Sequence, residues 1–218
     1  MLSDRPTIRS DAARVAAVLA AGFVAGIGIQ GTTFGALLTP AALIAFLSFK
    51  RASDRAVRVV LNYACFGLAL GIGSETWVPK AASEIDVPTH GVWLLATGLA
   101  VSHGMLPWGT IGVAAAGAAR LPHAAQTALL AFAVFVVETG VSVSGVLVPW
   151  TLLGHSQASI VATKQLAVLG GVPMISALLA GVAHVVAVAI RDPSHRRAHL
   201  LGVAIGLASF AACVILIV

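Results

Sequence analysis

The sequence predicts an all-α protein, a polytopic bundle of about seven transmembrane helices that forms a single domain over residues 1–218. Its composition is the first reason: 59% of the residues are hydrophobic, only 10% are charged and the mean hydropathy is +0.99, all far from the values of soluble domains. The second reason is that the apolar residues occur in runs of about 18 or more, the length that crosses a bilayer as a helix. The third is that the basic residues alternate regularly between the two sides of these runs.

Each predicted helix is an apolar run bounded by polar or charged residues. A polar segment with Arg5, Arg9 and Arg14 marks the start of the first run, and a basic segment separates the second run from the third. The last run ends with the sequence. The predicted spans are residues 12–30, 33–49, 56–75, 90–119, 124–146, 165–190 and 198–218.

The basic residues predict the orientation of these spans. Eleven of the thirteen Lys and Arg residues lie on one side of the predicted membrane, and only Lys80 and Lys164 lie on the other. By the positive-inside rule, the N-terminus is cytoplasmic and the C-terminus, after an odd number of spans, is outside. The eleven are Arg5, Arg9, Arg14, Lys50, Arg51, Arg55, Arg58, Arg120, Arg191, Arg196 and Arg197.

The fourth run has two candidate structures. Residues 103–109 interrupt it with a histidine, two glycines and a proline. The run is either one tilted helix kinked at Pro107 or two short re-entrant halves. A single crossing keeps Arg120 and Arg191 on the cytoplasmic side with the other basic residues, and the charge alternation therefore favours one helix.

Charge and cysteine content argue against several function classes. The net charge of +5 follows from the membrane orientation, and no basic patch with interleaved aromatic residues points to nucleic acid. Cys65 and Cys213 lie inside predicted spans without a CxxC motif, so we expect no disulfide and no metal site. His195 and His199 have the spacing of a metal pair, but two arginines lie between them and no third ligand is near, which favours a solvated basic surface. We expect no cofactor.

A few polar residues lie within the predicted spans. Glu138, in the outer part of the fifth helix, is the main candidate for function, since a carboxylate at this depth costs a few kcal/mol unless it is paired or hydrated. The alternative is a hydrogen-bonded structural Glu that faces the bundle. His103 and His184 fit polar core residues with satisfied hydrogen bonds better than they fit proton relays or ligands.

Two segments on the predicted outer side combine aromatic, proline and hydrogen-bonding residues. One is residues 75–88, which contains Trp77, and the other is residues 149–157, which begins with Pro149 and Trp150. Trp anchors helices at the membrane interface and Pro ends them. We therefore expect the two segments to form a vestibule at the level of the lipid head groups.

In this region the sequence resembles the apolipoprotein N-acyltransferases of bacterial inner membranes. In that family a Glu near the end of the fifth helix precedes a Pro-Trp pair and a Gly-Tyr-Ser-Gln signature, and Glu138, Pro149–Trp150 and residues 154–157 stand at the same spacing. Residues 166–173 resemble the start of the family's sixth helix, and residues 77–79 resemble its Trp-Ile-Pro segment. The resemblance covers most of the chain from about residue 67 onward.

The sequence also departs from the family pattern. His155 replaces the Tyr of the signature, and Val141 stands where family members usually carry an Arg. The family's chemistry resides in a nitrilase-like outer domain with a Glu-Lys-Cys triad after the seventh helix, whereas this sequence ends at Val218. Neither cysteine has the accessible, electropositive surroundings of a nucleophile, and adjacent residues such as His155 and Ser156 rarely form a catalytic pair. We therefore expect no extramembrane catalytic domain and assign no catalytic residue.

The resemblance implies the membrane part of an N-acyltransferase-like system in the bacterial inner membrane. This system moves an acyl chain from a phospholipid to a lipoprotein, and the chain itself is expected to be inactive without a separate nitrilase-like subunit. Trp150 is then an interface anchor, and Ser156 and Gln157 donate hydrogen bonds to lipid head groups or to the partner. The candidate binding residues are Trp77, Trp108, Glu138, Pro149, Trp150, His155, Ser156 and Gln157.

Two other interpretations stay open at the level of the sequence. One is a non-catalytic membrane scaffold that binds lipid or protein through the same vestibule. The other is a small transporter that uses Glu138, His103 and His184 as a polar path.

Overall fold

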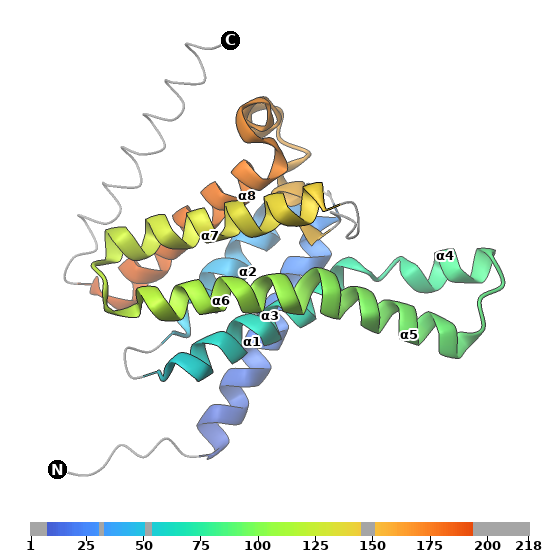
Figure 1. Cartoon of the computed structure of the whole chain (residues 1–218), viewed down its shortest axis with the longest axis horizontal. Coiled ribbons are helices and arrows are strands. Elements are labelled where there is room, and N and C mark those ends of the chain that lie inside the picture. Colours follow the sequence, from blue (N-terminus) through green and yellow to red (C-terminus); the bar gives the residue numbers. More distant parts are fainter. Residues whose placement is uncertain (1–7, 31–32, 51–53, 145–150, 194–218) are drawn as a thin grey trace.

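The computed structural model of the chain describes residues 8–30, 33–50, 54–144 and 151–193, and every element in these ranges is a helix (Figure 1). Six of the seven predicted spans fall on described residues, apart from residues 145 and 146 at the end of the fifth, and each of them is helical in its described part. The seventh, residues 198–218, lies outside the described residues. The elements are α1 (Ile8–Ile29), α2 (Gly35–Ser48), α3 (Ala56–Ser74), α4 (Val78–Glu84), α5 (Thr89–Leu99), the π-helical η1 (Ala100–Met105), α6 (Leu106–Gly117), the 3₁₀ turn η2 (Ala118–Arg120), α7 (His123–Val143), the 3₁₀ segment η4 (Leu153–Gln157) and α8 (Val161–Arg191).

Length and composition identify the helices that could cross a membrane. Among the described residues, the helical stretches 11–29, 56–74, 123–143 and 163–191 are long and apolar enough to span a bilayer. The apolar helix α2 is shorter, with 14 residues and Pro40 inside it. The predicted fold, a polytopic all-α bundle, is therefore confirmed for the described part of the chain.

The fourth predicted span is one continuous helix. Residues 89–117 run through α5, η1 and α6 without a break, and the predicted irregularity takes the form of a π-helical turn just before Pro107. At 1.5 Å per residue this stretch is roughly 43 Å long, which exceeds the roughly 30 Å hydrocarbon core. The excess forms an arm, in which α4 and α5 extend beyond the rest of the bundle (Figure 1). None of the residues of α5 is buried.

The sixth predicted span is interrupted near its start. Within α8, Gly170 and Gly171 have non-helical backbone angles, and the φ of Gly171 is +69°. This left-handed conformation favours glycine, and Pro173 just beyond it has no N–H for the preceding turn. Residues 161–169 consequently point in a different direction from the rest of α8 and are seen nearly end-on in Figure 1. Val161 and Val168 in this short stretch are exposed.

The helix α3 is the centre of the bundle and packs between α1 and α6. Phe66 of α3 stacks on Phe46 of α2 with ring centroids 4.2 Å apart and meets Trp108 of α6 edge to face at 4.7 Å. The crossing of α3 with η1 depends on small residues, since a Cβ at Gly104 would overlap the carbonyl oxygen of Gly67. Close backbone approach of this kind drives helix association in lipid, where apolar burial alone gives little preference.

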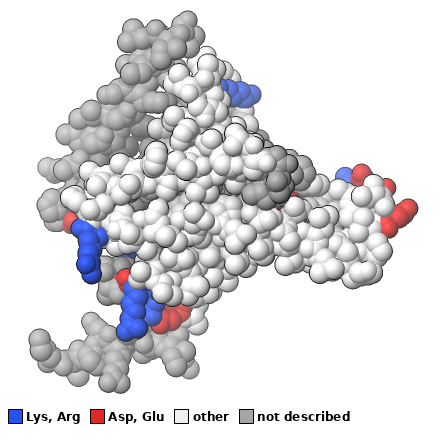
Figure 2. Space-filling view, viewed as in Figure 1, with Lys and Arg blue, Asp and Glu red and all other residues white. Residues whose placement is uncertain are grey.

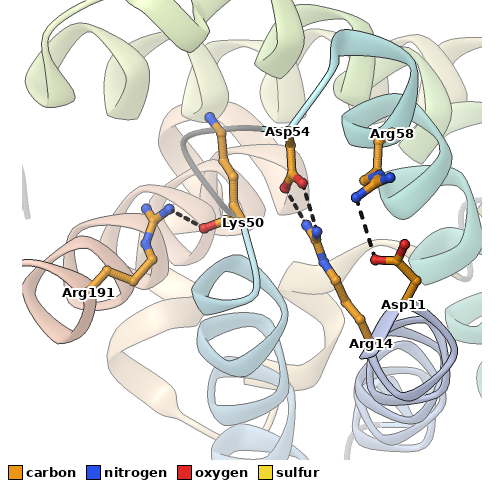
Figure 3. A network of polar contacts seen from close by, with 6 residues as sticks. All are labelled: Asp11, Arg14, Lys50, Asp54, Arg58 and Arg191. Atoms are coloured by element: carbon orange, nitrogen blue, oxygen red, sulfur yellow. Dashed lines mark hydrogen bonds and ion pairs between the residues drawn. The ribbon is translucent and has the colours of Figure 1, made fainter. Parts of the chain in front are cut away.

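Charged side chains gather at one end of the bundle and at the tip of the α4–α5 arm (Figure 2). At the bundle end, six residues from α1, α3, α8 and the α2–α3 connection lie close together (Figure 3). Arg14 donates two hydrogen bonds to Asp54, one of them at 2.7 Å, and both side chains are almost fully buried. Arg58 and Asp11 form a more exposed pair at 3.5 Å. Arg14, Lys50, Arg58 and Arg191 therefore share one side, as the charge alternation predicts; that this side is cytoplasmic stays a prediction.

Lys50 and Arg191 complete this charged end. The Arg191 guanidinium donates to the Lys50 carbonyl oxygen at 3.0 Å, and the Lys50 ammonium donates to Oε1 of Gln126 at 3.3 Å. Burial lowers the pKa of Lys50, and the charge of Arg191 acts in the same direction, whereas Asp54 opposes them. These contacts join the described ends of α2, α7 and α8.

Candidate functional site

The segment that carries the family signature lies inside the bundle. Thr151, Leu153, Ser156 and Gln157 are all buried, and His155 is half-buried. Pro149 and Trp150, predicted to anchor the same segment at the interface, lie outside the described residues. The 3₁₀ segment η4 therefore fills space between helices, and its backbone must find hydrogen-bond partners there.

Two helices accept hydrogen bonds from the backbone of the segment, and two of its side chains donate to the backbone of two further elements. Glu138 of α7 accepts a hydrogen bond from the Leu153 N–H at 3.2 Å, and Ser176 of α8 accepts one from the Gly154 N–H at 2.7 Å. Gln157 donates to the Ala36 carbonyl of α2 at 3.2 Å, and Thr151 donates to the His103 carbonyl of η1 at 2.9 Å. The signature segment thus ties together α2, η1, α7 and α8, which are far apart in the sequence.

Glu138 has a clear position in this network. It is 4% exposed and faces η4, and the hydroxyl group of Ser176 also approaches its carboxyl group. Among the described residues, its Oε2 atom has no partner within the limits for a hydrogen bond. Val141, one turn further along α7, is buried and apolar. The structure therefore brings Glu138 and the 154–157 motif together. Their contact is a hydrogen bond from the loop backbone, at Leu153, to the Glu138 carboxylate.

The two predicted tryptophans outside this segment lie in different surroundings. Trp77 precedes α4 at the base of the arm and is 41% exposed. Trp108 is 3% exposed and belongs to the aromatic cluster with Phe46, Tyr63 and Phe66. Trp77 thus has the exposure expected of an interface residue, whereas Trp108 packs in the core.

The polar path required by the transporter interpretation is not continuous among the described residues. His184 meets the Thr127 hydroxyl group at 2.8 Å, as expected for a polar core residue with a satisfied hydrogen bond. Thr127 and Glu138 are both on α7, roughly 16 Å apart along the helix axis. Glu138 makes its contacts with η4 instead.

Sequence reasoning missed an apolar groove beside the α4–α5 arm. Its volume is about 320 Å³, and it lies between α3 and α5 near the C-terminal end of α3. We call it the α3–α5 groove. Its apolar lining comes from Leu68, Ile72, Pro79, Trp93, Ala96 and Ala100, and its polar lining from Glu75, Thr76 and Thr97.

Glu75 is the ionisable residue in the lining of this groove. Its side chain is 2% exposed, and its Oε1 atom lies 3.5 Å from Nδ1 of His103, whose side chain is 3% exposed. Glu75 ends α3, and His103 lies in the π-helical turn. From the sequence, Glu75 lies at the end of an apolar span, where a carboxylate can reach water, and only the packing of α3 against η1 places it in a buried pair with His103. In the sequence, the one sign of a polar site around Glu75 was the neighbouring polar residue Thr76.

The contacts connect the groove to the signature segment. Glu75 lies beside the His103 side chain, and the His103 carbonyl accepts the hydrogen bond from Thr151, which immediately precedes η4. An apolar groove, a buried carboxylate and a buried polar loop therefore share one end of a bundle of membrane-type helices. These features define a helical membrane protein whose candidate site is an apolar groove beside a buried polar segment.

Comparison with protein families gives this site a context. Residues 21–185 match the family model of the apolipoprotein N-acyltransferase N-terminal domain, which covers well over half of the chain. The chain therefore belongs to this family, as the motifs predict, and is the membrane part of an N-acyltransferase-like protein. The matched region includes the α3–α5 groove, Glu138 and η4. No curated protein matches the chain.

Proposed function

We propose that this chain holds a phospholipid in the outer leaflet of a bacterial inner membrane for acyl transfer to a lipoprotein. The observation that supports the proposal best is the α3–α5 groove, with its volume of about 320 Å³ and its mainly apolar lining. This volume is within the roughly 300–1,000 Å³ typical of small-molecule sites. Its lining extends along α3 from Leu68 to Glu75, as an acyl chain aligned with the helices would need.

The proposal assigns a separate task to the signature segment. Its hydrogen bonds to α2, η1, α7 and α8 hold these four elements together next to the groove. A site that must position a lipid chain benefits from such a rigid support. In this role the buried Ser156 and Gln157 stabilise the support beside the groove, and Trp77 and Trp150 anchor the surrounding segments at the membrane interface.

The chemical step needs a thiol that the described residues do not offer. Cys65 is half-buried in α3 and packs against the core, without the accessible, electropositive surroundings that a nucleophilic thiolate needs. We propose that a nitrilase-like catalytic unit supplies the nucleophile at the outer surface and takes the acyl chain from the lipid in the groove. The same membrane part without such a unit would be a lipid-binding scaffold.

Lipid occupancy of the groove is the first test. The variant Ile72→Trp places a larger side chain in the groove, and Val113→Trp is a matched control at an exposed position of α6. Phospholipid that remains bound after purification in mild detergent is measured by mass spectrometry. We expect several-fold less bound phospholipid in Ile72→Trp than in Val113→Trp. Equal amounts in both variants would contradict a lipid site in this groove.

The second test addresses the catalytic partner. The tagged chain is cross-linked in native membranes and purified, and mass spectrometry searches for a co-purifying nitrilase-like protein. If one is found, N-terminal acylation of a lipoprotein becomes the assay, and Trp150→Ala should reduce it without affecting membrane insertion. If the intact, folded chain brings no such protein with it, the scaffold interpretation replaces acyl transfer.

A further inference from the structure

Two cations at the charged end of the bundle are bonded to neutral groups alone. Arg14 and Arg58 at this end each pair with an aspartate. Lys50 and Arg191 do not: the Arg191 guanidinium donates to the Lys50 carbonyl oxygen at 3.0 Å, and the Lys50 ammonium donates to the amide oxygen of Gln126 at 3.3 Å. In the part of the chain that the structure describes, neither of them forms an ion pair.

These two cations lie beside one another in a partly dehydrated place. Both are half-buried, and Figure 3 shows them where the ends of α2 and α8 meet. The positive charge of Arg191 acts unfavourably on Lys50. The Asp54 carboxylate opposes this effect, but it already accepts both hydrogen bonds of Arg14. Like charges that are partly removed from water repel one another. An anion bound to both would reverse this unfavourable interaction.

The surroundings of the pair favour an anion that carries apolar chains. Phe49 and Ile190, directly before Lys50 and Arg191 in the chain, are 36% and 55% exposed, and Leu121 near the start of α7 is 42% exposed. The helix α2 is apolar, and α7 and α8 contain stretches long enough to cross a bilayer. Basic groups between such helices bind the head groups of anionic lipids. The acyl chains of a lipid would cover apolar side chains that a free phosphate ion leaves exposed.

This place is separate from the α3–α5 groove. The charged end includes Arg58, near the start of α3, whereas the groove is lined by Ile72 and Glu75 at the C-terminal end of the same helix. From Ala56 to Ser74 the helix is roughly 27 Å long. A ligand at the charged end therefore does not occupy the groove.

We propose that Lys50 and Arg191 form a binding site for the phosphate group of an anionic phospholipid. The lipid gives both cations a counter-charge and holds the described ends of α2 and α8 together beside the start of α7. It is a structural ligand that stabilises the bundle and is not the acyl donor. The inference goes beyond the proposed function and does not depend on it.

The experiment measures how much different anions stabilise the chain. The full chain is purified in mild detergent, freed of lipid and titrated with phosphatidylglycerol or phosphatidylcholine with identical acyl chains, or with inorganic phosphate. Thermal denaturation follows each titration. Phosphatidylglycerol should stabilise the wild-type chain at about tenfold lower concentration than phosphatidylcholine, which corresponds to about 1.4 kcal/mol. Inorganic phosphate should have no effect.

Three variants test the two cations, each against its own lipid-free midpoint temperature. Lys50→Gln and Arg191→Gln each remove one charge of the site, and a glutamine at position 50 keeps a donor for Gln126. Arg58→Gln is the matched control, because it removes the same charge at the same end from a residue that pairs with Asp11. The two site variants should lose most of the tenfold difference between the lipids, and the control should keep it.

A wild-type chain without this difference would overturn the site, as would a difference that survives in Lys50→Gln or Arg191→Gln. Equal stabilisation by inorganic phosphate would overturn its assignment to a lipid. Should a site variant fail to fold, a photoreactive anionic phospholipid provides the test on the wild-type chain. The label should appear on peptides that contain Lys50 or Arg191, and unlabelled phosphatidylglycerol should compete for it better than phosphatidylcholine. Labelling confined to other peptides would overturn the site.

Discussion

The carboxylate of Glu138 on α7 accepts a hydrogen bond from the backbone N–H of Leu153, 15 positions later in the chain, at 3.2 Å. Both residues are buried. A short 3₁₀ segment inside a helical bundle leaves backbone groups without intrahelical partners, and in a membrane protein water cannot replace them. Glu138 satisfies one of these groups, which gives an ionisable residue at this depth a structural reason to be present.

This relationship predicts a graded response to substitution of Glu138. Glu138→Gln keeps an oxygen that can accept from Leu153 and should be close to the wild-type chain in stability. Glu138→Leu leaves the Leu153 N–H buried without an acceptor, which should cost about 1–3 kcal/mol. The two variants are compared by thermal denaturation in the same detergent. Equal stability of Glu138→Leu and Glu138→Gln would show that the hydrogen bond has no net effect.

The crossing of α3 and η1 predicts that Gly104 cannot be enlarged without cost. A Cβ at this position would overlap the Gly67 carbonyl oxygen, so Gly104→Ala should separate the two backbones and destabilise the bundle by about 1–3 kcal/mol. Gly117→Ala is the control, since no atom lies within 4 Å of a Cβ there. Helix propensity favours Ala over Gly, and the control should therefore unfold no earlier than the wild-type chain. A neutral Gly104→Ala would contradict the close approach.

The buried pair at the charged end predicts a strong effect of charge removal. Asp54→Asn leaves the buried Arg14 guanidinium without its counter-charge and should destabilise the chain by about 3–5 kcal/mol. The exposed pair gives the comparison: Asp11→Asn, opposite Arg58, should cost at most about 1 kcal/mol. Chemical denaturation in detergent measures both. Similar losses in the two variants would show that burial does not distinguish the pairs.

The break in α8 predicts that Gly171 is required for its conformation. With φ at +69°, Gly171→Ala forces a Cβ into the left-handed region, at a cost of roughly 1–2 kcal/mol. Gly140→Ala on α7, where a Cβ meets no atom within 4 Å, is the control and should be neutral or slightly stabilising. Protease accessibility around residues 161–169 should rise in Gly171→Ala alone. An unchanged pattern and stability would mean that the chain can straighten at this point.

Several features of the fold were predictable because they depend on local composition. The spans are apolar runs, and their ends in the structure agree with the predicted ends within a few residues, as α3 shows at Ala56–Ser74 against the predicted 56–75. The gathering of Arg14, Lys50, Arg58 and Arg191 at one end follows from the same alternation of charge. The family motifs around Glu138 and residues 154–157 were also visible, because their spacing is a property of the sequence alone.

Other features depend on which segments meet. The run at 90–119 gave no sign that its first third extends beyond the bundle, because an apolar helix looks the same whether lipid or protein surrounds it. The break at Gly170–Gly171 was hidden in a continuous apolar run. Ser156 and Gln157 were expected to face lipid or a partner, and the structure buries both, although whether they contribute to binding stays a prediction.

The sequence by itself determined that this chain is a helical membrane protein, where its spans lie and to which family it belongs, since hydropathy, charge alternation and motif spacing are readable residue by residue. The tertiary structure alone decided that Glu75, which lines an apolar groove, is buried beside His103, and that Glu138 bonds to a loop backbone. The physical reason is that burial of a polar group is a property of its neighbours in space. Those neighbours come from helices whose mutual approach is set by small residues such as Gly67 and Gly104, many positions apart in the chain.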